Sequence, residues 1–119
     1  MRDIIFRGKT KEGFWVEGFL TTNLRSELCI KLKTSPMFYP VDPETVGLYT
    51  GLKDVHSNPI YEGDVLQWEP CCVPRYVEFY KGEFCIFNEC GEPVNRLCRL
   101  NELYRIIGNI HDNPELLEK

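Results

Sequence analysis

The stretch from Tyr49 to Leu66 places the strongest limit on what this chain can fold into. It holds two turn signals, Ser57–Pro59 and Glu62–Asp64, with short apolar segments on either side. The proline directs Asn58 toward extended backbone, and Gly63 supplies the freedom that a tight turn requires. Such closely spaced turns leave little room for a helix. We therefore expect short strands here, with the rest of the chain packed around them.

Alternating side chains predict further strands on the N-terminal side. Residues 28–33 alternate apolar and polar positions, which places Leu28, Ile30 and Leu32 inward and the lysines in solvent. Strands are also expected at 4–7, 14–20 and 44–50, the last ending at Thr50–Gly51. Gly18 indicates a bulge or a close backbone approach. Three prolines break the segment that follows residue 33, which favours an extended edge piece at 38–41.

The C-terminal side predicts a small barrel. From Glu62 to Ile110 the expected order is strand, hairpin, strand, short helical turn, strand, which is the succession of an SH3-like barrel. Strands are expected at 65–68, 75–80, 84–87, 94–100 and 105–110. A hairpin turn is expected at 81–83, a helical turn at 101–104, and a short helix at 115–119 that Asn113 caps.

The predicted fold is therefore mainly β. An N-terminal β-hairpin and strand region, 1–47, extends an SH3-like β-barrel with a C-terminal helix, 48–119, in which the barrel itself spans about 48–112. The two parts are expected to form one structural unit.

Composition limits the classes of partner. The chain has 119 residues and a formal net charge of −4, with a sequence pI near 5.2, which argues against a general DNA-coating protein. No apolar run is long enough to span a membrane, and the charged N-terminus lacks the apolar core of a signal peptide. We expect a cytoplasmic protein without a membrane partner, whose six cysteines are reduced.

Two motifs in the organising stretch carry a resemblance to a known family. Tyr49–Asp54 reads YTGLKD and Ile60–Val65 reads IYEGDV. Together with the opening Met1–Arg7 and the closing Ile107–Leu117, they resemble the YopX family of small proteins encoded by bacteriophages and prophages. The resemblance implies a mostly β fold and a phage origin, and it implies no activity. The motif residues expected to shape the fold are Tyr49, Gly51, Asp54, Tyr61, Glu62, Gly63 and Asp64.

The chain departs from the family at one place. After Arg7 the family usually continues with a tryptophan-containing segment, whereas Gly8-Lys9-Thr10 follows here. Any role tied to that tryptophan is in doubt, and Trp15 is the nearest residue that can replace it.

Cysteine spacing gives little support for a metal site. Zinc sites use Cys-x₂₋₄-Cys pairs, and Cys85 and Cys90 reach that limit, but no second pair of this kind exists. Cys98 and the adjacent Cys71–Cys72 do not complete a set. The favoured interpretation is that these are small apolar side chains, with no metal, no disulfide and no other cofactor.

Three acidic residues in the organising stretch raise the question of catalysis. Asp54, Glu62 and Asp64 could act as general acid and base or hold a cation. No nucleophile or histidine accompanies them at a recognisable spacing, and His56 and His111 are expected to be loop residues. Asp64 is expected to cap its own turn. An enzyme that uses these carboxylates is the least favoured hypothesis.

Basic and aromatic residues are interleaved in the barrel region. Exposed Tyr76 and Tyr80 could stack on bases while Arg96 and Arg99 neutralise phosphates. The alternative, favoured because the chain is acidic overall, is a solvated strand face. Further cationic residues of this region are Arg75, Lys81 and Arg105.

The leading functional hypothesis is a non-enzymatic binding module for a host or phage protein. Contacts are expected from loops, namely Leu52–Asn58, which contains Asp54 and His56, and Cys71–Arg75. The proline-broken edge could also allow the chain to form a homo-oligomer. A small barrel that binds nucleic acid is the alternative.

Overall fold

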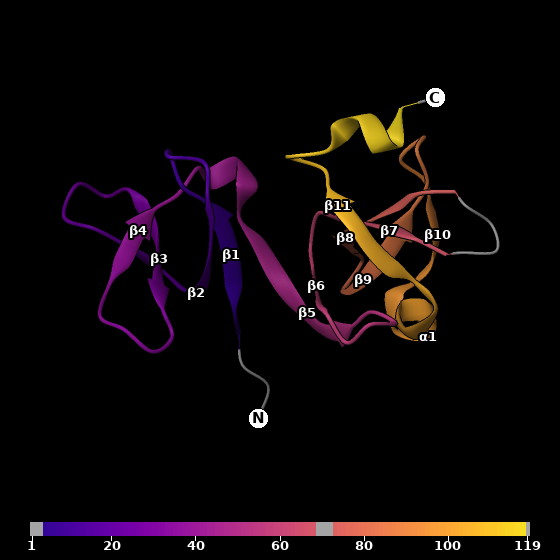
Figure 1. Cartoon of the computed structure of the whole chain (residues 1–119), viewed down its shortest axis with the longest axis horizontal. Helices are drawn as coiled ribbons and strands as arrows, with labels where there is room; N and C mark the ends of the chain where they lie inside the picture. Colours follow the sequence, from indigo (N-terminus) through magenta and orange to yellow (C-terminus); the bar gives the residue numbers. More distant parts are fainter. Residues whose placement is uncertain (1–3, 69–72, 119) are drawn as a thin grey trace. The chain divides into compact units, whose positions relative to one another are not determined.

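A computed structural model describes residues 4–68 and 73–118. The chain divides into two compact units, Met1–Tyr49 and Thr50–Lys119 (Figure 1). The opening residues 1–3 of the family resemblance and Cys71–Cys72 lie outside the described residues. Within the described ranges, no helix has the length and apolar character needed to cross a membrane.

The N-terminal unit is an antiparallel sheet with the strand order β4-β3-β2-β1-β5. Strand β5 continues past Tyr49, so its last residues belong to the second unit. The elements are β1 (Phe6–Lys9), β2 (Trp15–Thr22), β3 (Leu28–Leu32), β4 (Phe38–Pro40), the 3₁₀ turn η1 (Pro43–Thr45) and β5 (Gly47–Lys53).

The core of this unit contains Val16, Ile30 and Val41, and Leu28 and Leu32 pack against it. The alternation predicted for β3 is therefore confirmed, with Lys31 in solvent. The close approach predicted at Gly18 is also present. A Cβ at this position would lie 2.0 Å from the Lys31 carbonyl oxygen.

Cys29 is fully buried although it alternates with Ile30. Its thiol lies against the preceding loop and donates to the Glu27 carbonyl oxygen at 3.5 Å. The bounds predicted for strand β5 were wrong. The predicted strand 44–50 begins only at Gly47. Before it, the Asp42 side chain accepts a hydrogen bond from the Glu44 N–H and caps the turn η1. Strand β5 then runs through Gly51 instead of ending there.

The C-terminal unit contains the second antiparallel sheet, with the strand order β10-β9-β8-β7-β11. The last strand, β11, pairs with β7, and a short helical segment precedes β11. Short β6 lies next to β5. The elements are β6 (Pro59–Tyr61), β7 (Asp64–Gln67), β8 (Arg75–Tyr80), β9 (Glu83–Phe87), β10 (Pro93–Arg96), α1 (Leu97–Leu100), η2 (Asn101–Leu103), β11 (Arg105–Asn109) and η3 (Pro114–Leu117).

The prediction of a mainly β fold is confirmed, as is the predicted succession of strands and helical turn. Among the described residues no ladder joins β10 to β11, so hydrogen bonds do not close this sheet into a barrel. Side chains from β6, β7, β8, β9 and α1 contribute to its interior. The buried core residues are Ile60, Leu66, Val77, Ile86, Leu97 and Tyr104.

The predicted strand 94–100 ends early, at Arg96. Leu97 is fully buried and Leu100 packs against the same core cluster. In a strand these two side chains, three positions apart, would point to opposite faces, whereas one helical turn brings them to the same side. Core packing therefore selects the helix α1 over a longer strand.

The chain ends in a 3₁₀ turn, η3, rather than the predicted helix 115–119. Asn113 stands at the N-cap position, but its side chain makes no capping bond. Its Oδ1 instead accepts a hydrogen bond from the Asn109 N–H at 3.3 Å.

Prolines mark the edges of the sheets. Pro40 lies in β4, Pro59 in β6 and Pro93 in β10, and each of these strands is the last in its order. Since proline has no N–H to donate to a central ladder, an edge is where it fits. The edge strand predicted at 38–41 is thereby confirmed.

Candidate functional site

Asp54 is a buried carboxylate whose oxygens accept hydrogen bonds from backbone N–H groups. Its Oδ1 accepts hydrogen bonds from the N–H groups of His56 at 2.9 Å and Asn58 at 2.8 Å. Its Oδ2 accepts one from the Ile106 N–H at 3.0 Å. Burial raises the pKa of Asp54, but the hydrogen bonds from Asn58, Ile106 and His56 outweigh it and hold the pKa below its ordinary value. Asp54 therefore stays charged and holds its loop in place.

The loop Leu52–Asn58, predicted as a contact loop, borders a surface hollow of about 500 Å³. The Asn101 side chain ties this loop to η2 by donating to the Lys53 carbonyl oxygen at 2.7 Å. His56 is exposed on the loop. The second predicted loop, Cys71–Arg75, lies partly outside the described residues.

Asp64 has the turn-capping geometry that the sequence predicts. It is 2% exposed, and its Oδ2 accepts a hydrogen bond from the Tyr61 N–H at 2.8 Å. Between them, Gly63 adopts a φ of 94°, which favours glycine. Asp54 and Asp64 are both engaged by backbone amides, an arrangement that stabilises the fold. Within the described ranges, no group of three or more His, Cys, Asp or Glu side chains is placed to hold a metal.

Strand β8 carries both predicted tyrosines, and both contact Phe87 of the neighbouring strand β9. The Tyr76 ring stacks on Phe87 with a centroid distance of 5.4 Å. The Tyr80 ring meets Phe87 edge to face at 5.6 Å. Burial raises the pKa of Tyr76, and the nearby Glu78 carboxylate raises it further. These rings are therefore partly used in packing against the sheet.

The structure brings three of the four predicted nucleic-acid residues to one hollow. This β9–β10 hollow has a volume of about 520 Å³ and is lined by Tyr80, Lys81, Glu83, Arg96 and Arg99, among others. Arg96 Nε lies 3.2 Å from Glu83 Oε2, and Lys81 Nζ lies 5.3 Å from the centre of the Tyr80 ring. The lining thus combines three cations with one carboxylate. Tyr76 is not among the lining residues.

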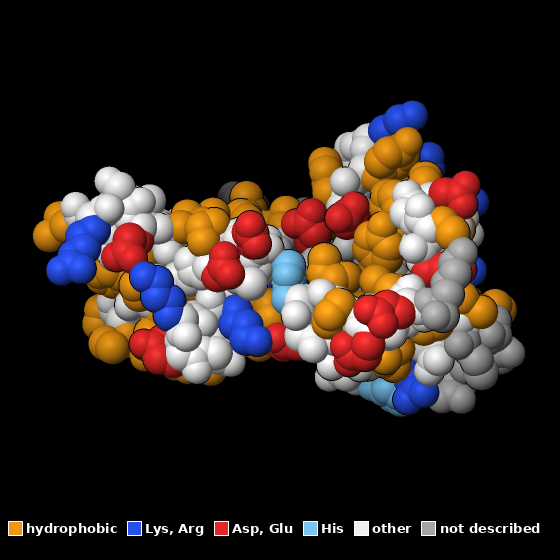
Figure 2. All heavy atoms as spheres, turned by 90° about the horizontal axis from the view of Figure 1, so that it is seen from above, with side chains coloured by type: hydrophobic (Ala, Val, Ile, Leu, Met, Phe, Trp, Pro, Cys, Tyr) orange, Lys and Arg blue, Asp and Glu red, His pale blue; other side chains and the backbone are white. Residues whose placement is uncertain are grey.

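The N-terminal unit exposes apolar side chains that sequence reasoning missed. Phe19 pairs with Lys31, and Lys31 pairs with Phe38, so the three form one row across β2, β3 and β4. Phe19 is 43% exposed and Phe38 48% exposed, and Leu24 is fully exposed. Figure 2 shows hydrophobic side chains among Lys and Arg side chains at the surface of this unit, on the left. We call Phe19, Leu24, Arg25, Lys31 and Phe38 the outer patch.

The outer patch includes a small hollow of about 320 Å³, which Leu24, Arg25 and Phe38 line together with Asn23 and Glu27. Leu24 lies between β2 and β3, where the sequence predicts neither strand nor helix, so nothing pointed to its placement. The alternation of β2, which puts Phe19 opposite the core side chains, was the available signal.

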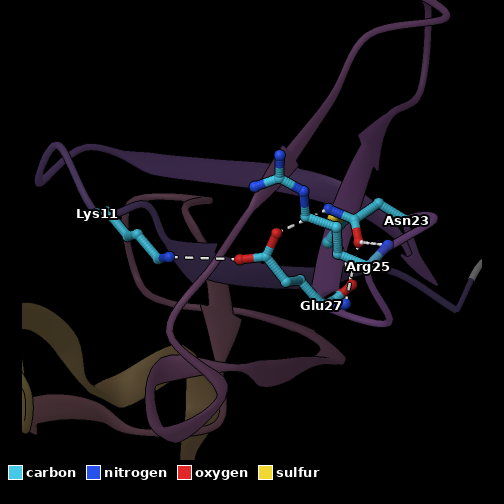
Figure 3. Close-up of polar contacts among 5 residues, drawn as sticks. Lys11, Asn23, Arg25 and Glu27 are labelled. Atoms are coloured by element: carbon cyan, nitrogen blue, oxygen red, sulfur yellow. Dashed lines mark hydrogen bonds and ion pairs between the residues drawn. The ribbon is translucent and has the colours of Figure 1, made fainter.

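A larger hollow of about 830 Å³ lies in the same unit and is lined by residues that include Lys11, Glu27, Leu28 and Val41. Lys11 and Asn23 approach the Glu27 carboxylate from opposite sides (Figure 3). Asn23 Nδ2 donates to it at 3.1 Å and Lys11 Nζ lies 3.3 Å away. The Asn23 hydrogen bond and then Lys11 lower the pKa of Glu27. The Glu27 carboxylate is thus already engaged by Lys11 and Asn23.

The four cysteines in the described ranges are free thiols. Cys29 and Cys85 are buried, and burial raises the pKa of both thiols. Cys90 and Cys98 are exposed.

The tryptophan nearest the departure from the family pattern packs against a cation. The Arg7 guanidinium lies 4.9 Å from the centre of the Trp15 ring, so the two side chains stack.

Comparison with solved structures finds a neighbour of the whole chain. The crystal structure of protein EF1440 from Enterococcus faecalis matches with a TM-score of 0.66 and 25% sequence identity, over 99% of this chain and 100% of that one. No curated protein matches the sequence. The sequence model of the YopX protein family matches residues 6–118. This match covers nearly the whole chain, and the chain therefore belongs to the YopX family.

Proposed function

We propose that this YopX-family chain is a non-enzymatic binding module, and that its partner is a protein of the bacterial host or of a phage. The outer patch carries this proposal. Exposing large apolar side chains to water is unfavourable unless a partner buries them. A cluster of them among polar or charged side chains is typical of a protein interface. Arg25 lies beside Leu24 and Phe38 in the small hollow, and Lys31 lies between Phe19 and Phe38 in the row across the strands.

Burying the patch against a partner would favour binding. Fully burying one Leu or Phe side chain contributes about 1.5–3 kcal/mol. Phe19, Leu24 and Phe38 are exposed in the isolated chain, so burying them against a partner would still supply much of this free energy. Two of the three carboxylates considered for catalysis support a non-enzymatic function, since Asp54 and Asp64 accept hydrogen bonds from backbone N–H groups.

Affinity capture with matched variants tests this function. The tagged chain and its Leu24→Ser and Phe38→Ser variants are incubated with lysate from bacteria carrying a YopX-encoding prophage. Bound proteins are identified, and each is then purified for a direct binding measurement. The control is Leu103→Ser, which removes an exposed apolar side chain from the second unit, outside the loops expected to make contacts. We expect both patch variants to lose the partner and the control to keep it. Equal capture by all four chains would end the proposal.

A second candidate function is the binding of single-stranded nucleic acid in the β9–β10 hollow. The observation that favours it is the gathering of Lys81, Arg96 and Arg99 beside the partly exposed Tyr80 ring. Cations neutralise phosphates and an exposed ring stacks on a base. Because the whole chain is acidic, any such binding depends on this local charge.

An electrophoretic shift assay separates the two functions. Labelled single-stranded DNA and RNA are titrated with the chain at low and at high salt, since binding through phosphates weakens as salt rises. Arg99→Ala is the test variant, and Lys11→Ala, which removes an exposed cation from the other unit, is the control. Binding at low salt that Arg99→Ala alone weakens would support this function. No shift at low salt would exclude it.

A further inference from the structure

We propose that strand β4 receives an extended segment of the partner protein as an added strand, and that this segment is apolar and acidic. The inference rests on the proposed function and specifies the partner chemistry of the same site. Edge strands present unpaired backbone groups, and adding a strand to such an edge is a common way to bind a peptide.

The hydrogen-bond pattern of β3 and β4 shows which backbone groups are available. The Leu32 N–H donates to the Met37 carbonyl and the Val41 N–H donates to the Leu28 carbonyl, both at 3.0 Å. In an antiparallel ladder, hydrogen-bonded pairs alternate with pairs whose groups point away. Phe38 is paired with Lys31 and Pro40 with Cys29, so the backbone groups of Phe38 and Pro40 point away from β3. On that side Thr10 already pairs with Val41, which leaves Phe38 at the open part of the edge.

Pro40 fits this pattern, because its missing N–H falls on the outward side. Of the three residues of β4, Phe38 has both its N–H and its carbonyl group on the open part of the edge, whereas the Pro40 end faces the segment that contains Thr10. An added strand would therefore accept one hydrogen bond from the Phe38 N–H and donate one to the Phe38 carbonyl.

Side chains beside this edge define the rest of the partner. The hollow formed by Leu24, Arg25 and Phe38 suits an apolar side chain of the added strand. Arg25 and Lys31 are both exposed, and Glu27 in the same hollow is already paired with Lys11 and Asn23. The net positive charge that remains favours carboxylates in the partner.

The same features disfavour a second copy of this chain as the occupant. In any pairing of two β4 strands, each copy has only the Phe38 N–H to donate, because Pro40 has none. Such a pairing would also bring Arg25 and Lys31 of both copies together, and like charges repel. A partner of opposite charge with a full set of N–H groups satisfies the edge better.

The probe is a fluorescent peptide in which Val and Glu alternate, compared with one in which Val and Lys alternate. Fluorescence polarisation at low salt measures the affinity of each for the full chain. We expect the Glu peptide to bind more tightly than the Lys peptide. The double variant R25E/K31E should reverse the preference. This exchange of charge does not touch the core, since both side chains are exposed.

The backbone bond is tested with Phe38→Pro against Phe38→Ala. Both variants lose the ring, and only the proline loses the outward N–H, so Phe38→Pro should bind the Glu peptide about tenfold more weakly, as expected for one hydrogen bond. Hydrogen exchange on the wild-type chain gives a readout that needs no variant. The Phe38 amide should be unprotected in the free chain and protected with the peptide bound.

The outcomes separate this inference from the proposed function. Partner capture that is lost in Phe38→Ser, with an unprotected Phe38 amide in the complex, would overturn strand addition and leave protein binding intact. Dimerisation of the chain that protects the Phe38 amide would assign the edge to a second copy and overturn the proposal. Equal affinity for the Glu and Lys peptides would overturn the acidic partner.

Discussion

The Asp54 carboxylate accepts a hydrogen bond from the Ile106 N–H at 3.0 Å, across a sequence separation of 52 residues. Its other oxygen accepts the N–H groups of His56 and Asn58. One side chain therefore shapes the loop after β5 and joins it to β11. This explains why an acidic residue is buried in a strand-rich unit without an ionic partner among these contacts: its charge is satisfied by backbone dipoles.

Asp54→Asn should destabilise the chain less than Asp54→Ala. The asparagine carbonyl can still accept the loop hydrogen bonds, but its NH₂ group would face the Ile106 N–H, and two donors cannot pair. We expect the free energy of unfolding to fall by about 2 kcal/mol in Asp54→Asn and about 3 kcal/mol or more in Asp54→Ala, since buried N–H groups lose their acceptor. Urea unfolding measures both.

The control for this comparison is Glu102→Gln. It changes an exposed carboxylate that lines the same surface hollow as Asp54. It should change the free energy of unfolding by less than about 0.5 kcal/mol. Equal losses in Asp54→Asn and Glu102→Gln would show that the Ile106 bond contributes nothing to stability.

Asp54 should also give the chain an acid-sensitive stability. Its pKa is lower in the folded chain than in the unfolded one, because the backbone N–H groups outweigh the effect of burial. The stabilisation is then complete above the unfolded pKa of about 3.9 and is lost as pH falls through the folded pKa. Unfolding midpoints measured from pH 7 down to pH 2 should fall more steeply below pH 4 for the wild type than for Asp54→Asn. Parallel curves would contradict this.

Local patterns predicted the strands well, because alternation and turn residues act over a few positions. The turn at Gly63, the edge strand at Pro40 and the close approach at Gly18 could all be predicted from neighbouring residues. Helix α1 could not. Its conformation depends on Leu97 and Leu100 both reaching a core that residues far away in the sequence provide.

The candidate site was less accessible to prediction for the same physical reason. Arg96, Arg99 and Tyr80 could be proposed together because all three fall in the region predicted as a barrel, and they do line one hollow. The outer patch depends on the register that aligns Phe19, Lys31 and Phe38. It also depends on Leu24, whose full exposure follows from a loop conformation that no periodicity encodes.

Gly18→Ala should disrupt the N-terminal unit. The added Cβ would lie 2.0 Å from the Lys31 carbonyl oxygen, which is a backbone atom that cannot rotate away. Relief requires β2 and β3 to separate, and we expect a loss of more than about 3 kcal/mol, a size typical of severe core disruption. Circular dichroism during thermal unfolding provides the measurement.

Gly13→Ala is the matched control for this substitution. Nothing lies within 4 Å of a Cβ at Gly13, although its φ is 95°. The cost should therefore be only about 1–2 kcal/mol, from the left-handed backbone alone. If the two alanine variants have the same unfolding temperature, the close contact at Gly18 does not limit the pairing of β2 with β3.

The thiols should differ in reactivity according to burial. Cys90 and Cys98 are exposed, whereas Cys29 and Cys85 are buried and have raised pKa values. Since the thiolate is the reacting form, iodoacetamide should modify Cys90 and Cys98 in the folded chain and reach the buried pair only after denaturation. Peptide mass spectrometry distinguishes the sites. Rapid modification of Cys85 in the folded chain would contradict the packing of β9.

Asn23→Ala should expose Cys29 without unfolding the chain. The Asn23 Oδ1 accepts the N–H groups of Arg25 at 2.9 Å and Glu27 at 3.0 Å, and so holds the loop against which the Cys29 thiol lies. Losing these bonds should cost about 1 kcal/mol and let the loop open locally, which makes Cys29 reactive toward iodoacetamide under native conditions. Lys11→Ala removes only an exposed ion pair with Glu27 and should leave Cys29 protected. Equal protection in both variants would mean that the sheet itself, and not the loop, covers the thiol.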